Sequence, residues 1–309
     1  MDSNLQKYQA FVKTVETGSF THAALLLNYA QSTVSKMIGD LEKEWGVTLL
    51  ERSRSGVQLT ACGEQILPYA RALLEDYQKL SGFVDEMNGL QTGTVRIGTF
   101  SSVAIHWLPN IVAAFQKDYP GIEYELLLGD YDEVEQWLAE GRIECGFLRL
   151  PTRPAFETLS LKQDEYKVVL PKGHPLAAYS AIEPHALDGQ PFLLLEHGGR
   201  TEASDLLARF QLHPNVRFTT WEDYAILSMV EKGLGIGILP QMILQRIPYE
   251  VEIRPLTTPY YREIGLAMKD RAGLAPAAKK FLEYLGFRER TFSDPSGRES
   301  SAGPHISAM

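Results

Sequence analysis

Apolar residues in the first part of the chain recur at three- and four-residue spacings, which predicts short amphipathic helices. Three such runs occupy residues 5–15, 20–27 and 32–41, and Gly18 is placed to end the first helix. Between residues 47 and 59, apolar positions flank a polar tip instead, which predicts a small β-hairpin. The pattern therefore predicts an N-terminal helical unit that ends in a hairpin.

A long helix is predicted to follow the hairpin, with Thr60 as its N-cap. Its apolar positions keep a heptad spacing, and the seam that they form consists of Ile66, Ala70, Leu73, Tyr77, Leu80, Val84 and Met87. A helix over residues 61–88 would extend about 42 Å at about 1.5 Å per residue. A narrow seam of this length cannot be buried against the N-terminal unit alone. The spacing therefore predicts a partner helix and a homodimer.

Strand-like and helix-like segments alternate in the rest of the chain, which predicts a doubly wound α/β architecture with ligand crevices at the carboxyl ends of strands. The predicted strands are 94–98, 122–128, 143–148, 168–170, 192–195, 235–239 and 265–268. The predicted helices are 107–119, 132–140, 203–210, 223–232 and 276–285. Residues 291–309 are rich in Ser, Gly and Pro with few apolar residues, so we expect a disordered tail.

Composition excludes several classes of protein. The chain has 309 residues, of which 44% are hydrophobic and 22% charged, as in a soluble protein of two or three domains. No stretch approaches the roughly 18 uninterrupted apolar residues of a membrane helix. The start Met1–Asn4 is polar and unlike a secretory signal, and Cys62 and Cys145 are too few for a disulfide framework or a cysteine zinc site. We expect a cytoplasmic protein with no cofactor, metal or membrane partner.

Residues 20–41 carry the strongest functional signal. Two crossed helices need a small residue at their contact, a turn residue that tolerates left-handed geometry, and a branched apolar residue that closes the angle. Ala24, Asn28 and Val34 supply these at offsets of four and six. The second helix of such a unit enters the DNA major groove by its first turn. The candidate DNA contacts are Gln31, Ser32, Thr33, Ser35 and Lys36 on that turn, with Arg52 and Arg54 at the hairpin tip.

The chemistry of these side chains suits double-stranded DNA. Gln31 can pair with adenine, Lys36 can reach guanine, and Arg52 and Arg54 can hold flanking phosphates or the minor groove. The net charge of −9 argues against nonspecific coating of nucleic acid, and residues 1–60 carry equal numbers of acidic and basic side chains. The alternative is a helical dimerisation domain with an ordinary polar face. The hairpin and the heptad helix favour DNA binding, because a dimer that reads two half-sites needs both.

Several runs in the first 65 residues, taken in order, resemble the N-terminal signature of the LysR-type transcriptional regulators. They are Ser19–Ala24, Gln31–Lys36, Leu41–Glu42, Leu49–Arg52 and Leu59–Glu64. The resemblance covers about residues 4–290. It implies an α/β protein with an N-terminal winged helix-turn-helix, a long linker helix that dimerises, and a two-lobed periplasmic-binding-protein-like α/β effector domain. Members of this family are usually tetramers that respond to small molecules, so the resemblance also implies a homotetramer.

The resemblance assigns DNA contact to Gln31, Ser32, Ser35, Lys36, Arg52 and Arg54. The sequence departs from the family pattern at Lys36, where Arg is frequent, and at Leu50, where Phe is frequent. Lysine cannot make the bidentate fork of arginine, so a phosphate contact suits Lys36 better than a base contact.

The same resemblance suggests a division of the chain. Residues 1–60 would form the winged helix-turn-helix DNA-binding domain, residues 61–90 the linker helix for dimerisation, and residues 94–290 the effector-binding domain. Lobe I would comprise residues 94–163 and 267–290, and lobe II residues 164–266, with two crossover strands between them.

A candidate effector site follows the first strand of the α/β region. Thr99, Ser101 and Ser102 precede a predicted helix, and free amides with hydroxyls at a helix start suit a small anion. The alternative is simple N-capping by one of the two serines. In the resembling family this loop holds effectors. Further residues predicted to face the crevice are Asp130, Arg149, His197 and Trp221. Arg149 would form an ion pair with an anionic ligand, His197 would hydrogen-bond the ligand, and the Trp221 ring would line the site.

Other motifs argue against catalysis. The glycine run Gly233–Pro240 lacks the G-x-G-x-x-G spacing and follows a helix, Cys145 lies among apolar residues, and no H-E-x-x-H or G-x-S-x-G motif occurs. We therefore expect a sequence-specific transcriptional regulator, not an enzyme, with operator DNA and a small-molecule effector as partners. The alternatives are a solute-binding or enzymatic α/β protein with an appended helical dimerisation module, and a nucleoid protein without an effector.

Overall fold

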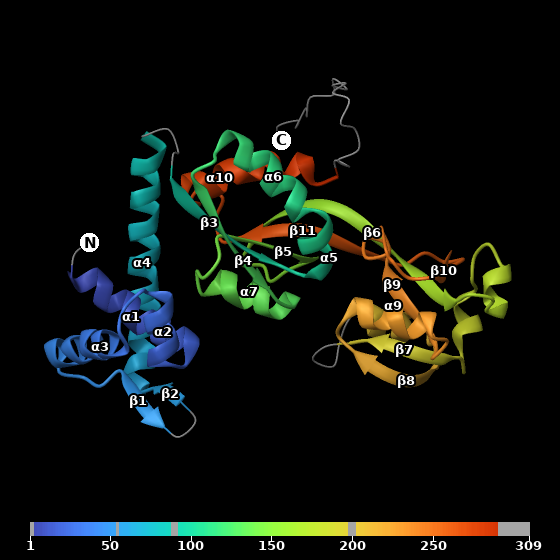
Figure 1. The fold of residues 1–309 in the computed structure, drawn as a ribbon, viewed down its shortest axis with the longest axis horizontal. Coiled ribbons are helices and arrows are strands. Elements are labelled where there is room, and N and C mark those ends of the chain that lie inside the picture. Colours follow the sequence, from blue (N-terminus) through green and yellow to red (C-terminus); the bar gives the residue numbers. More distant parts are fainter. Residues whose placement is uncertain (1–2, 54–55, 88–91, 197–201, 290–309) are drawn as a thin grey trace.

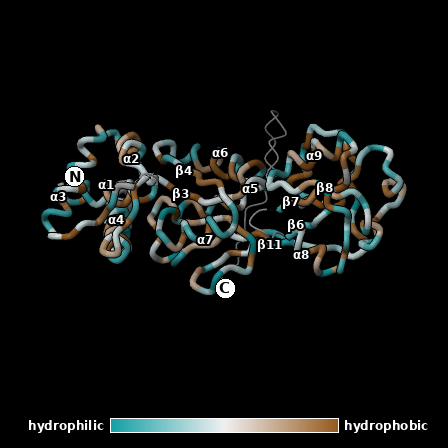
Figure 2. Tube along the Cα trace, turned by 90° about the horizontal axis from the view of Figure 1, so that it is seen from below, coloured by the Kyte–Doolittle hydropathy of each residue, from teal (hydrophilic) through white to brown (hydrophobic). Residues whose placement is uncertain are grey.

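The computed structural model describes residues 3–53, 56–87, 92–196 and 202–289. A helical N-terminal unit and one long helix lie together at one end of the long axis, and two α/β lobes follow along it (Figure 1). Figure 2 shows hydrophobic stretches inside the N-terminal unit and inside each lobe. Separate clusters of buried apolar side chains accordingly form in the N-terminal unit and in each lobe.

The N-terminal unit contains the predicted helices and hairpin. Its elements are α1 (Ser3–Thr17), α2 (Phe20–Leu26), α3 (Gln31–Trp45), β1 (Leu50–Ser53) and β2 (Gly56–Leu59). Ala24 and Val34 are both buried where α2 and α3 meet, and Asn28 has a φ of 57° in the turn between them. The three roles predicted for these residues are confirmed, because each residue has the packing or backbone conformation that its role requires.

The long helix α4 (Ala61–Met87) begins where Thr60 caps it, since the Gly63 amide donates a 2.9 Å hydrogen bond to Thr60 Oγ1. The first part of the heptad seam packs on the N-terminal unit, where Ala70 is buried. Further along, Leu73, Tyr77, Leu80 and Val84 are all exposed, Leu80 by 60%. The predicted helix is therefore confirmed, and the described residues leave Leu73, Tyr77, Leu80 and Val84 of its seam uncovered.

One mixed sheet connects the two lobes, with the strand order β4-β3-β5-β11-β6-β9-β7-β8 and β10 paired to β6. Its strands are β3 (Gly93–Thr99), β4 (Ile122–Leu128), β5 (Cys145–Leu150), β6 (Glu157–Pro171), β7 (Pro191–Leu195), β8 (Asn215–Thr220), β9 (Ile236–Pro240), β10 (Val251–Pro255) and β11 (Tyr261–Met268). Residues 157–165 of β6 pair with β11, and residues 166–169 pair with β9. The long strand β6 thus passes from lobe I into lobe II.

Helices cover the sheet in both lobes (Figure 1). Lobe I has α5 (Ser101–His106), α6 (Leu108–Asp118), α7 (Tyr131–Ala139) and α10 (Pro276–Leu282), followed by a 3₁₀ segment (Glu283–Glu289). Lobe II has α8 (Glu202–Arg209), α9 (Asp223–Glu231) and two 3₁₀ turns (Pro175–Ala178, Pro184–Leu187). None of the helices in the described ranges has an apolar run long enough to cross a membrane.

Several sequence predictions for the α/β region need correction. Strands β8 and β10 were not predicted, because β8 is an exposed edge strand and β10 is only half-buried along its length. The predicted strands 168–170 and 265–268 are the apolar ends of the longer β6 and β11, whose other halves are more polar. The predicted helix 276–285 becomes 3₁₀ after Leu282. The predicted disordered tail, 291–309, lies outside the described residues.

Candidate functional site

The first turn of α3 presents polar side chains to solvent above an apolar support. Gln31, Ser32 and Lys36 are exposed, and Thr33 and Ser35 are half-buried. On the opposite side of the helix Val34, Ile38 and Leu41 are buried in the core of the N-terminal unit. The five predicted DNA-contacting residues of α3 therefore lie on one accessible turn whose position is fixed by packing.

Hydrogen bonds to the hairpin backbone hold the hairpin against the helices. Glu42 of α3 accepts hydrogen bonds from the amides of Leu49 and Leu50, at 2.7 and 3.2 Å to one carboxylate oxygen. At the other strand the Val57 amide donates to the carbonyl of Gly18, at 3.1 Å. Arg52 lies on β1 opposite Val57, whereas Arg54 falls outside the described residues. Glu42 thus positions the hairpin relative to α3. It was not identified from the sequence, because only side chains able to contact DNA were considered there.

Between the two lobes, the structure gathers a buried polar cluster around Arg262 of β11, which is only 6% exposed. Its Nε and Nη2 donate to Asp164 Oδ2 at 3.0 and 2.8 Å, and Nη2 also donates to Ser102 Oγ at 2.8 Å. The guanidinium lies 5.1 Å from the centre of the Phe100 ring. Asp164 accepts a further hydrogen bond from the amide of Met242, at 2.9 Å. Of the predicted effector residues, Ser102 joins this cluster.

Two side-chain contacts cross from lobe I to lobe II beside this cluster. The Tyr131 hydroxyl donates to Glu202 Oε1 of α8 at 2.7 Å, and it accepts from Arg262 Nη1 at 3.2 Å. Arg149 Nη1 contacts Asp205 Oδ2 of the same helix at 3.2 Å. Because α8 belongs to lobe II, both contacts stabilise the lobes in their present relative position. Arg149 was predicted as an anion-binding residue, and its observed partner is a carboxylate of this chain.

The remaining predicted effector residues are not all brought together. Asp130 is the N-cap of α7, where it accepts from the amide of Glu133 at 2.8 Å in a capping box. Thr99 is buried at the end of β3, Ser101 begins α5, and Trp221 is 66% exposed after β8. His197 lies outside the described residues. The alternative of N-capping by Ser101 or Ser102 is not observed, because Phe100 occupies the N-cap position of α5 without a side-chain cap.

Burial shifts the pKa values of several side chains in the two lobes. Burial raises the pKa of Asp223, at the start of α9, to about 6, with Arg262 opposing the shift and Glu222 and Glu202 adding to it. Burial also raises the pKa of the Tyr131 hydroxyl, and Glu202 adds to this rise. Tyr131 is therefore a neutral donor near neutral pH. Burial likewise raises the pKa of the Cys145 thiol, which removes thiolate character from this side chain.

The residues Arg262, Asp164, Tyr131 and Glu202 were not identified from the sequence. For Arg262 and Asp164 the sequence offered one signal. Each is a charged residue in or beside a run of residues typical of a buried strand. Such a charge is rarely buried without a partner. The sequence could flag each residue as unusual, but it could not show that they are paired.

Two family models match the chain over most of its length. Residues 5–64 match the model described as "Bacterial regulatory helix-turn-helix protein, lysR family", and residues 88–288 match "LysR substrate binding domain". The chain belongs to the LysR family. This LysR-type transcriptional regulator has an N-terminal helix-turn-helix and a two-lobed α/β effector domain, as the sequence predicted.

Curated relatives and solved structures agree with this assignment. YvbU of Bacillus subtilis, described as an HTH-type transcriptional regulator, is 36% identical over 284 residues, which are 90% of this chain and 96% of YvbU. A full-length variant of OxyR from Pseudomonas aeruginosa has a TM-score of 0.71 at 22% identity, covering 92% of this chain and 94% of OxyR. Full-length CbnR complexed with its target DNA has a TM-score of 0.64 at 22% identity, covering 92% and 99%. These two structures share the fold.

Proposed function

We propose that this LysR-type regulator binds operator DNA through the first turn of α3 and changes its DNA binding when a small molecule binds between the lobes, beside the buried cluster around Arg262. The observation that carries the DNA-binding part is the exposed polar turn Gln31–Lys36 held above a buried apolar support. A helix start of this kind fits the major groove. The target DNA bound by CbnR, which has the same fold, supports the same use of this unit.

Within this interface, Gln31 would contact base edges, and Ser32, Thr33 and Ser35 would contact phosphates or base edges. Lys36 would contact phosphate, because its ammonium group is a point charge without the fork of arginine. Arg52 and Arg54 of the hairpin would reach the flanking backbone or the minor groove.

The exposed part of the α4 seam supports a homodimer, because paired helices would cover Leu73, Tyr77, Leu80 and Val84. A dimer places two copies of α3 on two half-sites. We infer a homotetramer and a cytoplasmic location from the family. We keep the domain division at 1–60, 61–90 and 94–290, and we place the boundary between the lobes at residues 163/164 and 266/267.

For the effector we propose a site between the lobes, for which Thr99, Ser101, Ser102, Asp130, Arg149, His197 and Trp221 remain the candidate contacts. Arg262 and Tyr131 join this set on their position beside Ser102. An effector that pairs with Arg149 would have to replace its 3.2 Å contact with Asp205, and so would alter one of the contacts between the lobes. Ligand binding and lobe orientation are coupled in this arrangement.

The experiment that tests DNA binding is fluorescence anisotropy with labelled DNA from upstream of the chain's own gene. Gln31→Ala and Lys36→Ala should each weaken binding. Their matched controls are Gln116→Ala and Lys117→Ala, which make the same side-chain changes at exposed positions of α6 in lobe I. Equal affinities for the α3 variants and the wild type would remove this face as the DNA-reading surface and would favour the solute-binding alternative.

A further inference from the structure

Helix α7 contacts a different part of the molecule at each of its ends. At its first residue, the Tyr131 hydroxyl donates to Glu202 of lobe II at 2.7 Å. Its C-cap, Glu140, is followed by a turn through Gly141 and Arg142 that lies against the N-terminal unit and α4. At about 1.5 Å per residue, the backbone positions of residues 131 and 140 lie about 14 Å apart along the helix axis. One short helix therefore extends from the proposed effector site between the lobes to the DNA-binding unit.

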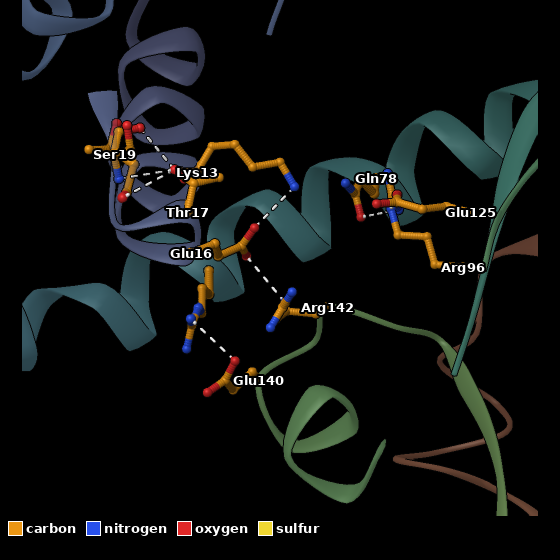
Figure 3. Close-up of polar contacts among 11 residues, drawn as sticks. Lys13, Glu16, Thr17, Ser19, Gln78, Arg96, Glu125, Glu140 and Arg142 are labelled. Atoms are coloured by element: carbon orange, nitrogen blue, oxygen red, sulfur yellow. Dashed lines mark hydrogen bonds and ion pairs between the residues drawn. The ribbon is translucent and has the colours of Figure 1, made fainter. Parts of the chain in front are cut away.

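Ion pairs make the contact at the far end of α7. Figure 3 shows Glu140 and Arg142 extending from their turn toward the helices of the N-terminal part. Arg142 Nε lies 4.0 Å from Glu16 Oε1 of α1, and Arg71 Nη2 of α4 lies 3.4 Å from Glu140 Oε2. Glu16 also pairs with Lys13 at 3.0 Å, so the carboxylate that meets Arg142 is held from its own helix. These pairs connect lobe I to α1 and α4 within a single chain.

The backbone of this turn fits closely beside α4. Gly141 has a φ of 69°, which L side chains rarely adopt, and a Cβ atom placed there would lie 3.0 Å from the Glu75 carboxylate. The turn therefore fits closely against α4 at Gly141 and pairs with it through Glu140 and Arg71. A displacement of the turn must change its contacts with α1 and α4.

Helix α7 itself is packed so tightly that its two ends cannot move independently. Val134 and Leu138 are fully buried on the sheet of lobe I. A Cβ atom at Gly146 of β5 would lie only 2.5 Å from Val134 Cγ1, so the absence of a side chain there is what allows the helix this close. Densely packed interiors transmit displacement because they are hardly compressible. A shift of Tyr131 is then carried along the helix to residues 140–142.

The space between the N-terminal unit and lobe I, by contrast, is only partly filled by side chains. A cavity of about 330 Å³ lies between α1, α2, α4 and lobe I, and Val12, Leu27, Leu74 and Leu127 line it together with the charged residues of the junction. The buried Nε of Arg71 has no acceptor among the described residues. Partly exposed ion pairs around a cavity hold two bodies less firmly than a packed apolar interface does. This junction can therefore change without disrupting either core.

We propose that α7 transmits the state of the contact between the lobes to the DNA-binding unit of the same chain, with Tyr131 as the positioning residue at that contact and the Glu140–Arg142 turn as the contact that orients α1 and α4. When Tyr131 bonds Glu202, α7 holds the turn against Glu16 and Arg71. When that bond is lost, the turn shifts and the N-terminal unit is released from lobe I. The regulatory meaning of this coupling rests on the proposed function, but the coupling itself is a property of the folded chain.

Hydrogen–deuterium exchange of the full-length protein tests the coupling without DNA or effector. Tyr131→Phe removes the hydroxyl that bonds Glu202, and we expect faster exchange in residues 12–17 of α1 by about threefold or more, the scale of coupling between contacting residues. The matched control is Glu135→Gln, which removes the 2.7 Å ion pair with Arg153 from the middle of the same helix. It should leave residues 12–17 unchanged. Should Tyr131→Phe fail to fold, Glu202→Ala breaks the same contact from lobe II.

A second background shows whether α7 carries the effect. In the variant Glu140→Gln/Arg142→Gln both junction ion pairs are absent, so adding Tyr131→Phe should have no further effect on exchange in residues 12–17. An equal effect of Tyr131→Phe in both backgrounds, or none in either, would overturn the proposal. DNA affinity is measured separately on the same proteins: loss of coupling with intact DNA binding contradicts only this inference, and absence of DNA binding with intact coupling contradicts only the proposed function.

Discussion

Arg262 of β11 and Asp164 of β6 stand directly opposite each other in the antiparallel pairing of the two strands that connect the lobes. Their side chains form a buried ion pair with two hydrogen bonds, at 2.8 and 3.0 Å. Burial costs each charge its hydration, which the partner must replace. The connection between the two lobes is thus built around a charge pair whose members depend on each other.

Removing one member of this pair should destabilise the protein strongly. Asp164→Ala leaves a buried guanidinium without its carboxylate and should lower the free energy of unfolding by about 3–5 kcal/mol. Urea unfolding followed by circular dichroism measures the change. Glu135→Gln breaks an ion pair whose arginine is largely exposed and should cost less than about 1 kcal/mol. Similar losses for the two variants would contradict the importance of the Arg262–Asp164 pair.

The stability of lobe II should depend on pH through Asp223. The pKa of its carboxyl is about 6 in the folded protein against 3.8 in the unfolded chain, so the folded state binds more protons between these values. The stabilisation is complete below pH 3.8 and is lost as the pH rises through 6, by up to about 3 kcal/mol. Asp223→Asn cannot ionise. The free energy of unfolding of the wild type relative to this variant should therefore fall between about pH 4 and about pH 7, and a constant difference would refute the assigned burial.

The two kinds of DNA contact on α3 should respond differently to salt. Lys36→Ala removes the proposed phosphate contact, so the slope of log affinity against log salt should decrease in magnitude by about 1. Gln31→Ala removes the proposed base contact and should weaken binding to the preferred site by about 1–3 kcal/mol with little change in slope. Anisotropy titrations over a salt series separate the effects. Identical slopes for Lys36→Ala and Lys117→Ala would place Lys36 away from phosphate.

The exposed seam of α4 predicts the oligomeric state. Leu80→Asp places a charge where a paired helix would bury an apolar side chain, so the dimer should dissociate at concentrations where the wild type stays associated. Sedimentation velocity measures the mass. Leu234→Asp is the matched control, because Leu234 is 46% exposed at a position remote from α4. A wild-type mass for Leu80→Asp would show that dimerisation uses another surface.

The helix pair that carries the proposed DNA-reading turn, and the long helix α4, could be predicted from the sequence because both depend on local periodicity. Val34 and Ala24 are buried, and Asn28 adopts the left-handed conformation expected from its place in the turn. The candidate effector residues were brought together less completely. Ser102 joins the buried cluster around Arg262, but Asp130 is a helix cap, and Arg149 pairs with an acidic residue that sequence spacing does not connect to it.

Helical spacing, caps and the heptad seam are properties of residues a few positions apart, so the sequence by itself determined the DNA-binding unit, the long helix and the family of this protein. The partners of Arg262 lie 98, 131 and 160 positions away along the chain, and the contact between Tyr131 and Glu202 spans 71. Strand register and the packing of one lobe on the other brought these groups together. Only the tertiary structure could decide that, because a buried charge reveals its need for a partner but not which distant residue supplies it.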